Sequence, residues 1–154
     1  MRIRTIVLTL AALFAAVVVC FAADAIMGTW KLNEAKSKLS PGTGTNTTVI
    51  YAAAGDSVKV TVDGVDADGK PAHNEWTGKF DGKDYALKGD PASDMRSYKR
   101  VDNHTLALTN KKGGKVTLTG NIVLSADGKS RTVSISGTDA KGKKFSYTAV
   151  YDKQ

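Results

Sequence analysis

Cysteine is almost absent from this chain of 154 residues, which contains only Cys20. Cys20 lies in a stretch, 5–21, that carries no charge and directly follows a short basic start with Arg2 and Arg4. A basic start, an apolar segment and then small residues is the order of a cleavable secretory signal. Removal of residues 1–22 would leave no thiol. A disulfide, a thiolate nucleophile and a cysteine-ligated metal are therefore excluded from the mature protein.

The small residues at the end of this segment define where cleavage is expected. Cleavage after Ala22 or Ala23 fits the pattern, and cleavage after Ala25 fits nearly as well. Val19 is not the small residue that a lipoprotein signal needs before Cys20. An uncleaved anchor needs about 20 apolar residues, and the alanine-rich end favours cleavage instead. We predict a signal peptide at 1–22, one domain at 23–154, a periplasmic or secreted location, and no stable membrane anchor after cleavage.

Residues and motifs suited to metal binding or catalysis are also scarce. His73 and His104 are the only histidines, and neither has a second histidine or cysteine nearby. Metal sites need three or four converging donors, so no metal is expected. The sequence contains no nucleophile elbow, phosphate loop or dinucleotide fingerprint, so neither catalysis nor a cofactor is expected. Carboxylates for a glycosidase pair are present, but nothing in the sequence selects two of them.

The charge is moderately basic, with 22 Lys and Arg against 15 Asp and Glu and a formal net charge of +7. Several lysines, among them Lys112, Lys129, Lys141 and Lys143, stand beside glycines in expected turns rather than in one block, which indicates a solvated surface. No basic run with interleaved aromatics is present, so nucleic acid is not an expected partner.

Short segments with period-2 alternation dominate the rest of the chain. Val58, Val60 and Val62 alternate with polar residues, and glycine paired with Asp, Asn or Lys separates such segments. The segment Asn33 to Leu39 is the one candidate for a short helix before Pro41. The expected strands are 27–32, 47–53, 58–63, 72–80, 84–87, 95–100, 105–109, 116–119, 132–136 and 145–151.

Tight turns between consecutive strands favour antiparallel order. We predict an all-β, up-and-down meander of about ten strands that closes into a barrel, with a β-sandwich as the alternative. Gly120 lies in the middle of a long expected strand and indicates a bulge or bend there.

The first expected strand reads Gly28-Thr29-Trp30-Lys31-Leu32-Asn33. A Gly-x-Trp on the first strand of such a meander resembles the calycin superfamily of lipocalins and fatty-acid-binding proteins, and the chain also resembles short bacterial lipocalin-like domains. The resemblance implies that Trp30 closes one barrel end, with an arginine from a late strand lying across it. Arg131 is one candidate for that arginine and Arg100 is another. The two lid helices of fatty-acid-binding proteins, and the C-terminal helix and disulfide of lipocalins, have no counterpart here.

Aromatic residues make up only 7% of the chain, and a few of them are candidates for a ligand site inside the barrel. Arg96 and Tyr98 share one face of a strand, where they form either an exposed pair or a pair that faces the cavity and fixes a carboxylate. The full set of ligand-binding candidates is Trp76, Arg96, Tyr98, Tyr147 and Tyr151.

Three functional hypotheses remain at this point. The leading one is an exported protein that binds a small apolar or amphipathic ligand without catalysis. If Val, Leu and Ile fill the barrel instead, the domain is a structural or protein-interaction module. A barrel enzyme that uses scattered residues is the third. The ligand and the oligomeric state are not specified by the sequence.

Overall fold

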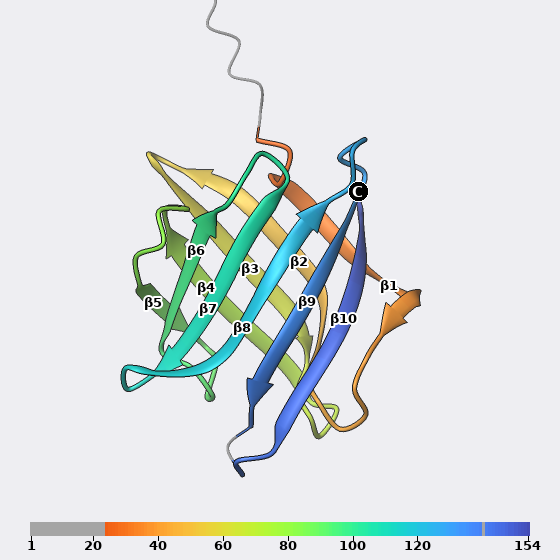
Figure 1. The fold of residues 1–154 in the computed structure, drawn as a ribbon, viewed down its shortest axis with the longest axis vertical. Helices are drawn as coiled ribbons and strands as arrows, with labels where there is room; N and C mark the ends of the chain where they lie inside the picture. Colours follow the sequence, from red (N-terminus) through yellow and green to blue (C-terminus); the bar gives the residue numbers. More distant parts are fainter. Residues whose placement is uncertain (1–23, 140) are drawn as a thin grey trace, which may run out of the picture.

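The computed structural model describes residues 24–139 and 141–154, and these form a closed barrel of antiparallel strands (Figure 1). Each strand pairs with the next one along the chain, and the first strand also pairs with the last. The predicted up-and-down barrel is confirmed, and the alternative of a β-sandwich is wrong. The strands are β1 (Gly28–Lys38), β2 (Thr45–Ala54), β3 (Ser57–Val65), β4 (Pro71–Gly78), β5 (Tyr85–Lys88), β6 (Met95–Arg100), β7 (Thr105–Lys112), β8 (Lys115–Leu124), β9 (Ser130–Thr138) and β10 (Lys144–Lys153).

Alternation along the strands builds the core. In β3, Val60 is fully buried and lies opposite Tyr51 of β2 on one side and Trp76 of β4 on the other. Cross-strand neighbours share one face of a sheet, so these three side chains all face the interior. The same arrangement continues around the barrel, because each strand directs alternate residues inward.

The loops follow the expected turn chemistry. Between β3 and β4, Asp66 Oδ1 accepts hydrogen bonds from the backbone N–H groups of Asp68 and Lys70, each at 2.9 Å. Gly69 has a φ of 77°, a conformation that glycine adopts without a side-chain penalty. The Asp-x-Asp-Gly sequence here therefore forms a hairpin turn.

The helix expected at Asn33 to Leu39 is wrong, because β1 continues through this segment to Lys38. Asn33 pairs with Val150 of β10, and after a register shift Lys38 pairs with Thr148. Ser37 supports the irregular stretch, since its hydroxyl accepts a hydrogen bond from the N–H of Val150 at 2.9 Å. Barrel closure requires β1 to pair with β10, and this pairing overrides the local preference for a helical turn.

The bulge expected at Gly120 is also misplaced. Gly120 pairs regularly with Leu108 of β7 and Ile135 of β9, and the register shift lies between Asn110 and Lys111. A Cβ at position 120 would come within 2.4 Å of Ile135 Cδ1 and 2.5 Å of the carbonyl oxygen of Ser134. Glycine is needed here because the neighbouring strand packs closely against it.

The barrel has two different ends, which we name after a residue at each. The Trp30 end, at the top of Figure 1, is where β1 begins and β10 finishes; the Arg96 end, at the bottom, is where β6 begins. Residues 1–22, the predicted signal peptide, lie outside the described residues. Within 24–139 and 141–154, no helix is long and apolar enough to cross a membrane.

Candidate ligand-binding site inside the barrel

The Trp30 end is closed by a turn formed by residues 24–27. Trp30 is completely buried, and its indole Nε1 donates a hydrogen bond to the carbonyl oxygen of Ile26 at 2.7 Å. Lys153 Nζ donates to the carbonyl oxygen of Ala25 at 2.8 Å, and the guanidinium of Arg100 pairs with the carboxylate of Asp24. Backbone and side-chain contacts together therefore hold this turn over the end of the barrel.

Arg131 lies directly beneath this closed end. Its Cζ is 5.0 Å from the ring centroid of Trp30, 5.1 Å from that of Tyr51 and 4.8 Å from that of Tyr151. These distances are within the range of cation–π attraction. The other candidate, Arg100, instead lies over Phe80, with its Cζ 5.4 Å from that ring.

Aromatic side chains fill the wall formed by β4, β5 and β6. Trp76 packs edge-on against Tyr98, with ring centroids 4.8 Å apart, and stacks on Phe80 at 6.4 Å. Its Nε1 donates to the carbonyl oxygen of Arg96 at 2.8 Å. Trp76 therefore supports the wall behind the cavity, while its own ring does not line it.

The interior contains a cavity of about 60 Å³. Four of the five ligand-binding candidates from the sequence line it; Arg96, Tyr98, Tyr147 and Tyr151 are brought together there, and only Trp76 is not. Arg96 and Tyr98 are both buried, so the alternative of an exposed pair is wrong. The remaining lining residues are Asn46, Val49, Tyr51, Val62, Leu108, Leu118, Ile122, Arg131, Val133 and Ile135.

A chain of polar groups holds the Arg96 side chain. Its Nε donates to Asn110 Oδ1 at 2.9 Å, and its Nη1 donates to Asn74 Oδ1 at 3.4 Å. Asn110 Nδ2 donates in turn to the hydroxyl of Ser93, which lies 2.9 Å from that of Thr117. The partners of this buried guanidinium are neutral amide oxygens, which orient the cation without cancelling its charge.

Three of the tyrosines around the cavity have a pKa above the ordinary value of 10. Burial raises the pKa of Tyr98, Tyr147 and Tyr151. Arg131 opposes the effect at Tyr151, and both Arg96 and Arg131 oppose it at Tyr98. Tyr151 donates its hydroxyl proton to the carbonyl oxygen of Asn46 at 2.9 Å. The cavity lining therefore combines guanidinium groups and protonated tyrosine hydroxyls with apolar side chains.

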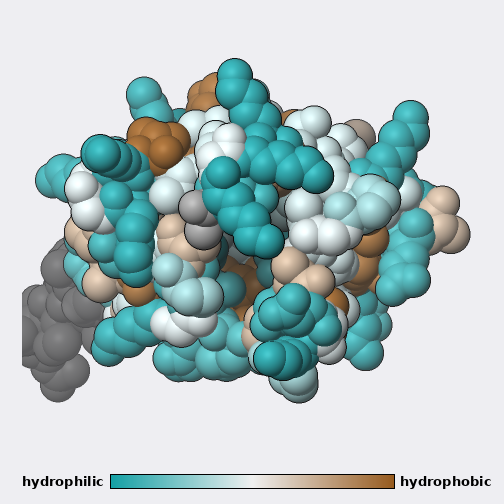
Figure 2. Space-filling model, turned by 90° about the horizontal axis from the view of Figure 1, so that it is seen from below, coloured by the Kyte–Doolittle hydropathy of each residue, from teal (hydrophilic) through white to brown (hydrophobic). Residues whose placement is uncertain are grey.

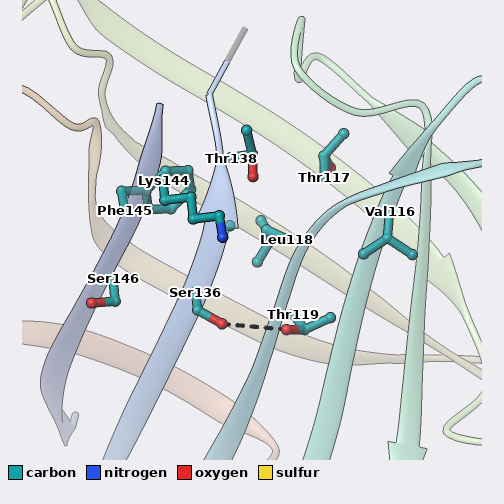
Figure 3. Close-up of a pocket in the computed structure, with 10 residues that line it drawn as sticks. Val116, Thr117, Leu118, Thr119, Ser136, Thr138, Lys144, Phe145 and Ser146 are labelled. Carbon is teal, nitrogen blue, oxygen red and sulfur yellow. Dashed lines mark hydrogen bonds between the residues drawn. The ribbon is translucent and has the colours of Figure 1, made fainter. Parts of the chain in front are cut away.

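The Arg96 end is hollowed and rimmed with hydrophilic side chains. Figure 2 looks onto this end and shows teal side chains around a depression with hydrophobic atoms in its depth. A larger hollow of about 490 Å³ lies beside it on β8, β9 and β10 (Figure 3). Its lining includes the hydroxyls of Thr119 and Ser136, and it shares Leu118 with the interior cavity. This second hollow is open to solvent and carries few apolar side chains, so the interior cavity is the better candidate site.

Several residues of the site were missed by the sequence reasoning. Three of them are Asn74, Asn110 and Tyr51, each at an inward position of its strand. Asn74 lies two residues from Trp76, Asn110 two residues from Leu108, and Tyr51 two residues from Val49. Strict alternation was sufficient to place them inside. Asn46 lies beside a register shift in β2, and alternation fails at such a point.

Within the described residues, no cluster of three or more His, Cys, Asp or Glu side chains could hold a metal ion. His73 is exposed on the outer face of β4, where its Nδ1 lies 2.6 Å from Asp63 Oδ1. This hydrogen bond raises the pKa of His73 above its ordinary value of 6.5.

No protein-family model matches the chain, and no curated protein matches it. Solved structures do resemble its fold. The first is that of EF1p2_mFAP2b bound to DFHBI, with a TM-score of 0.52 and 13% identity over 86% of this chain and 97% of the other. A second is the redesigned β-barrel mFAP1 bound to DFHBI, with a TM-score of 0.47 and 17% identity over 86% and 98%. The chain is thus an antiparallel β-barrel similar in fold to the first of these structures.

Proposed function

We propose that this protein binds a small apolar or amphipathic molecule inside its barrel, through the Arg96 end, and performs no chemistry on it. The observation that carries the proposal is the interior cavity, in which apolar side chains surround guanidinium and tyrosine hydroxyl donors. Sites for small molecules combine a mostly apolar wall with a few convergent polar groups.

The size of the cavity limits the ligand. Sites for drug-sized molecules typically measure about 300–1,000 Å³, and this cavity measures about 60 Å³. The ligand is therefore small, or only one end of it enters while the remainder lies in the depression at the Arg96 end. The barrel structure with the higher TM-score is bound to DFHBI, which supports the general idea that such a fold accommodates a small molecule.

The proposal also covers the family of the protein and its cellular location. The Gly-Thr-Trp opening of β1, together with an arginine beside Trp30, supports a lipocalin-like barrel. The signal-like segment at 1–22 supports cleavage and a periplasmic or secreted location. An exported carrier or sensor of small molecules is consistent with both.

A matched pair of variants tests the proposal. Val133 lines the cavity, whereas Val123 is 45% exposed on the neighbouring strand β8. The mature protein is titrated with neutral anilinonaphthalene, which fluoresces in apolar surroundings. Val133→Phe fills the cavity and should weaken binding by about tenfold or more. Val123→Phe adds the same ring outside and should leave binding unchanged.

Native mass spectrometry after exposure to cell lipid extract provides a second readout. A stoichiometric bound species that Val133→Phe fails to retain would support the proposal. Absence of any bound species, together with a dye titration that neither saturates nor responds to fatty acids, would overturn it. That result would favour a structural or interaction module, which the largely filled interior also supports.

A further inference from the structure

Two buried arginines share the interior cavity. Arg96 is 6% exposed and Arg131 is 2% exposed, and both line the same space. They come from different strands, β6 and β9. A guanidinium remains charged at any physiological pH, so the cavity contains two fixed positive charges.

Arg131 has hydrogen-bond donors without acceptors. Its Nε and Nη1 are buried and have no hydrogen-bond partner among the described residues. Aromatic rings of Trp30, Tyr51 and Tyr151 lie within cation–π distance of its Cζ. Such rings stabilise the charge through the π-faces, but they do not accept the N–H bonds as an oxygen would. Unpaired buried donors of this kind are rare in folded proteins, and these two N–H groups are free to donate to a bound oxygen.

The charges of both arginines are also unmatched by a carboxylate. No Asp or Glu lines the cavity, and the salt bridges found among residues 24–139 and 141–154 include neither arginine. Arg96 is held by the amide oxygens of Asn110 and Asn74. Burying unpaired charge is unfavourable, and an anion in the cavity would relieve this for both arginines.

We infer that the polar part of the bound molecule is a carboxylate or another small oxyanion, held between Arg96 and Arg131. The inference rests on the proposed function and specifies the class of ligand. Arg131 Nε and Nη1 donate to the oxyanion from the Trp30 side, while the Arg96 guanidinium and the Tyr98 hydroxyl face it from the other. The apolar remainder of an amphipathic acid then points toward Tyr147 and Leu118, at the Arg96 end.

The anion can come from an amphipathic acid or from a free small anion in solution, and two measurements separate these sources. In the first, the mature protein is titrated with anilinonaphthalene sulfonate and with neutral anilinonaphthalene, which share one aromatic skeleton. The sulfonate should bind about tenfold tighter or more. Arg131→Gln and Arg96→Gln should each weaken sulfonate binding about tenfold more than they weaken binding of the neutral dye.

Arg100→Gln is the matched control. Arg100 pairs with Asp24 at the Trp30 end and does not line the cavity. This variant removes one positive charge from the protein at a distance from the site, so it should leave binding of both dyes unchanged. Circular dichroism of every variant shows whether the barrel has folded.

The second measurement detects a free small anion. Thermal unfolding is followed at constant ionic strength while gluconate, which is too large for the cavity, is replaced by formate. A rise in Tm in wild type and in Arg100→Gln, but not in Arg131→Gln, identifies a free anion as an occupant. A rise in wild type and both variants, or in none of the three proteins, shows that formate does not occupy this site.

The outcomes distinguish the inference from the proposed function. Equal binding of the two dyes, with no effect of either cavity variant, overturns the inference and leaves the proposed function intact. Stabilisation by formate that depends on Arg131, with no binding of either dye and no species retained from lipid extract, supports the anion site and overturns the proposed function. No dye binding, no species retained from lipid extract and no formate effect together overturn both.

Discussion

The two ends of the barrel bury their polar groups in different ways. At the Trp30 end, the turn of residues 24–27 covers the opening, and Trp30 is hydrogen-bonded and fully buried beneath it. At the Arg96 end, Arg96 and Asn110 form a buried polar network below a hydrophilic rim. The first arrangement favours stability, because it buries a large aromatic with its polar atom satisfied. The second maintains polar groups inside at some cost, as the proposed binding site requires.

Removing the indole at the closed end should have the largest effect on stability. Trp30→Ala should lower the free energy of unfolding by about 3–5 kcal/mol, since it removes a fully buried ring and leaves a cavity. Urea denaturation monitored by circular dichroism measures the change. Trp30→Phe is the control; it retains most of the apolar contact and loses only the hydrogen bond to Ile26, which costs about 1 kcal/mol. If Trp30→Ala lowered the free energy of unfolding by less than about 1 kcal/mol, the closed end would not stabilise the barrel.

The same substitution at the two buried arginines should give different results. Arg96→Met leaves Asn110 Oδ1 buried without its donor, and should lower the free energy of unfolding by about 1–3 kcal/mol. Arg131→Met removes two unpaired buried donors, so the lost cation–π attraction is offset and the change should stay within about 1 kcal/mol. Chemical denaturation of both variants tests this difference. Equal losses at the two positions would contradict the distinction between a satisfied and an unsatisfied cation.

The ion pair at the closed end should contribute less. Asp24 and Arg100 pair while each side chain remains about one-third exposed, so solvent screens the attraction. Asp24→Asn should lower the free energy of unfolding by about 0.5 kcal/mol in low salt and by less in high salt. The side chain of Asp56, which pairs with Lys79, is 81% exposed. Asp56→Asn breaks this pair and should have no measurable effect on the free energy of unfolding. An effect of Asp24→Asn that salt does not reduce would indicate that the pair acts through packing instead.

The smallest effect concerns the outer face of β3 and β4. The hydrogen bond to Asp63 raises the pKa of His73 in the folded protein. The folded state therefore binds the proton more tightly than the unfolded state, and the stabilisation is complete below pH 6.5 and disappears as the pH rises through the folded pKa. Wild type should become slightly less stable over this interval than at lower pH, and His73→Asn should not. A parallel pH dependence of thermal unfolding in both proteins would contradict this assignment.

Local sequence patterns predicted most of the strands. Alternation predicted the inward valines of β3, and the segment Met95 to Arg100 was predicted with its observed bounds. The errors occurred where a distant strand determined the outcome. Asn33 to Lys38 is extended because β10 pairs with it, and Gly120 is required by the close approach of Ser134 and Ile135 rather than by a bulge. Contacts between residues far apart in sequence leave no local signal.

The candidate site was predictable in its members but not in its arrangement. Arg96, Tyr98, Tyr147 and Tyr151 were all named from their strand positions, and the structure places them around one cavity. Arg131 was considered only for its relation to Trp30. Its unpaired donors could not be recognised from the sequence, because they depend on which acceptors the other strands bring within reach.

Alternation and glycine chemistry act over a few residues, so local sequence patterns were enough to specify an antiparallel β-protein with inward apolar faces and tight turns. Only the assembled sheet shows that β1 pairs with β10, that about 60 Å³ stays open inside, and that two arginines from β6 and β9 share that space. These features involve residues that are far apart along the chain. Closure, cavity volume and charge compensation all depend on side chains that meet only when the whole sheet has closed.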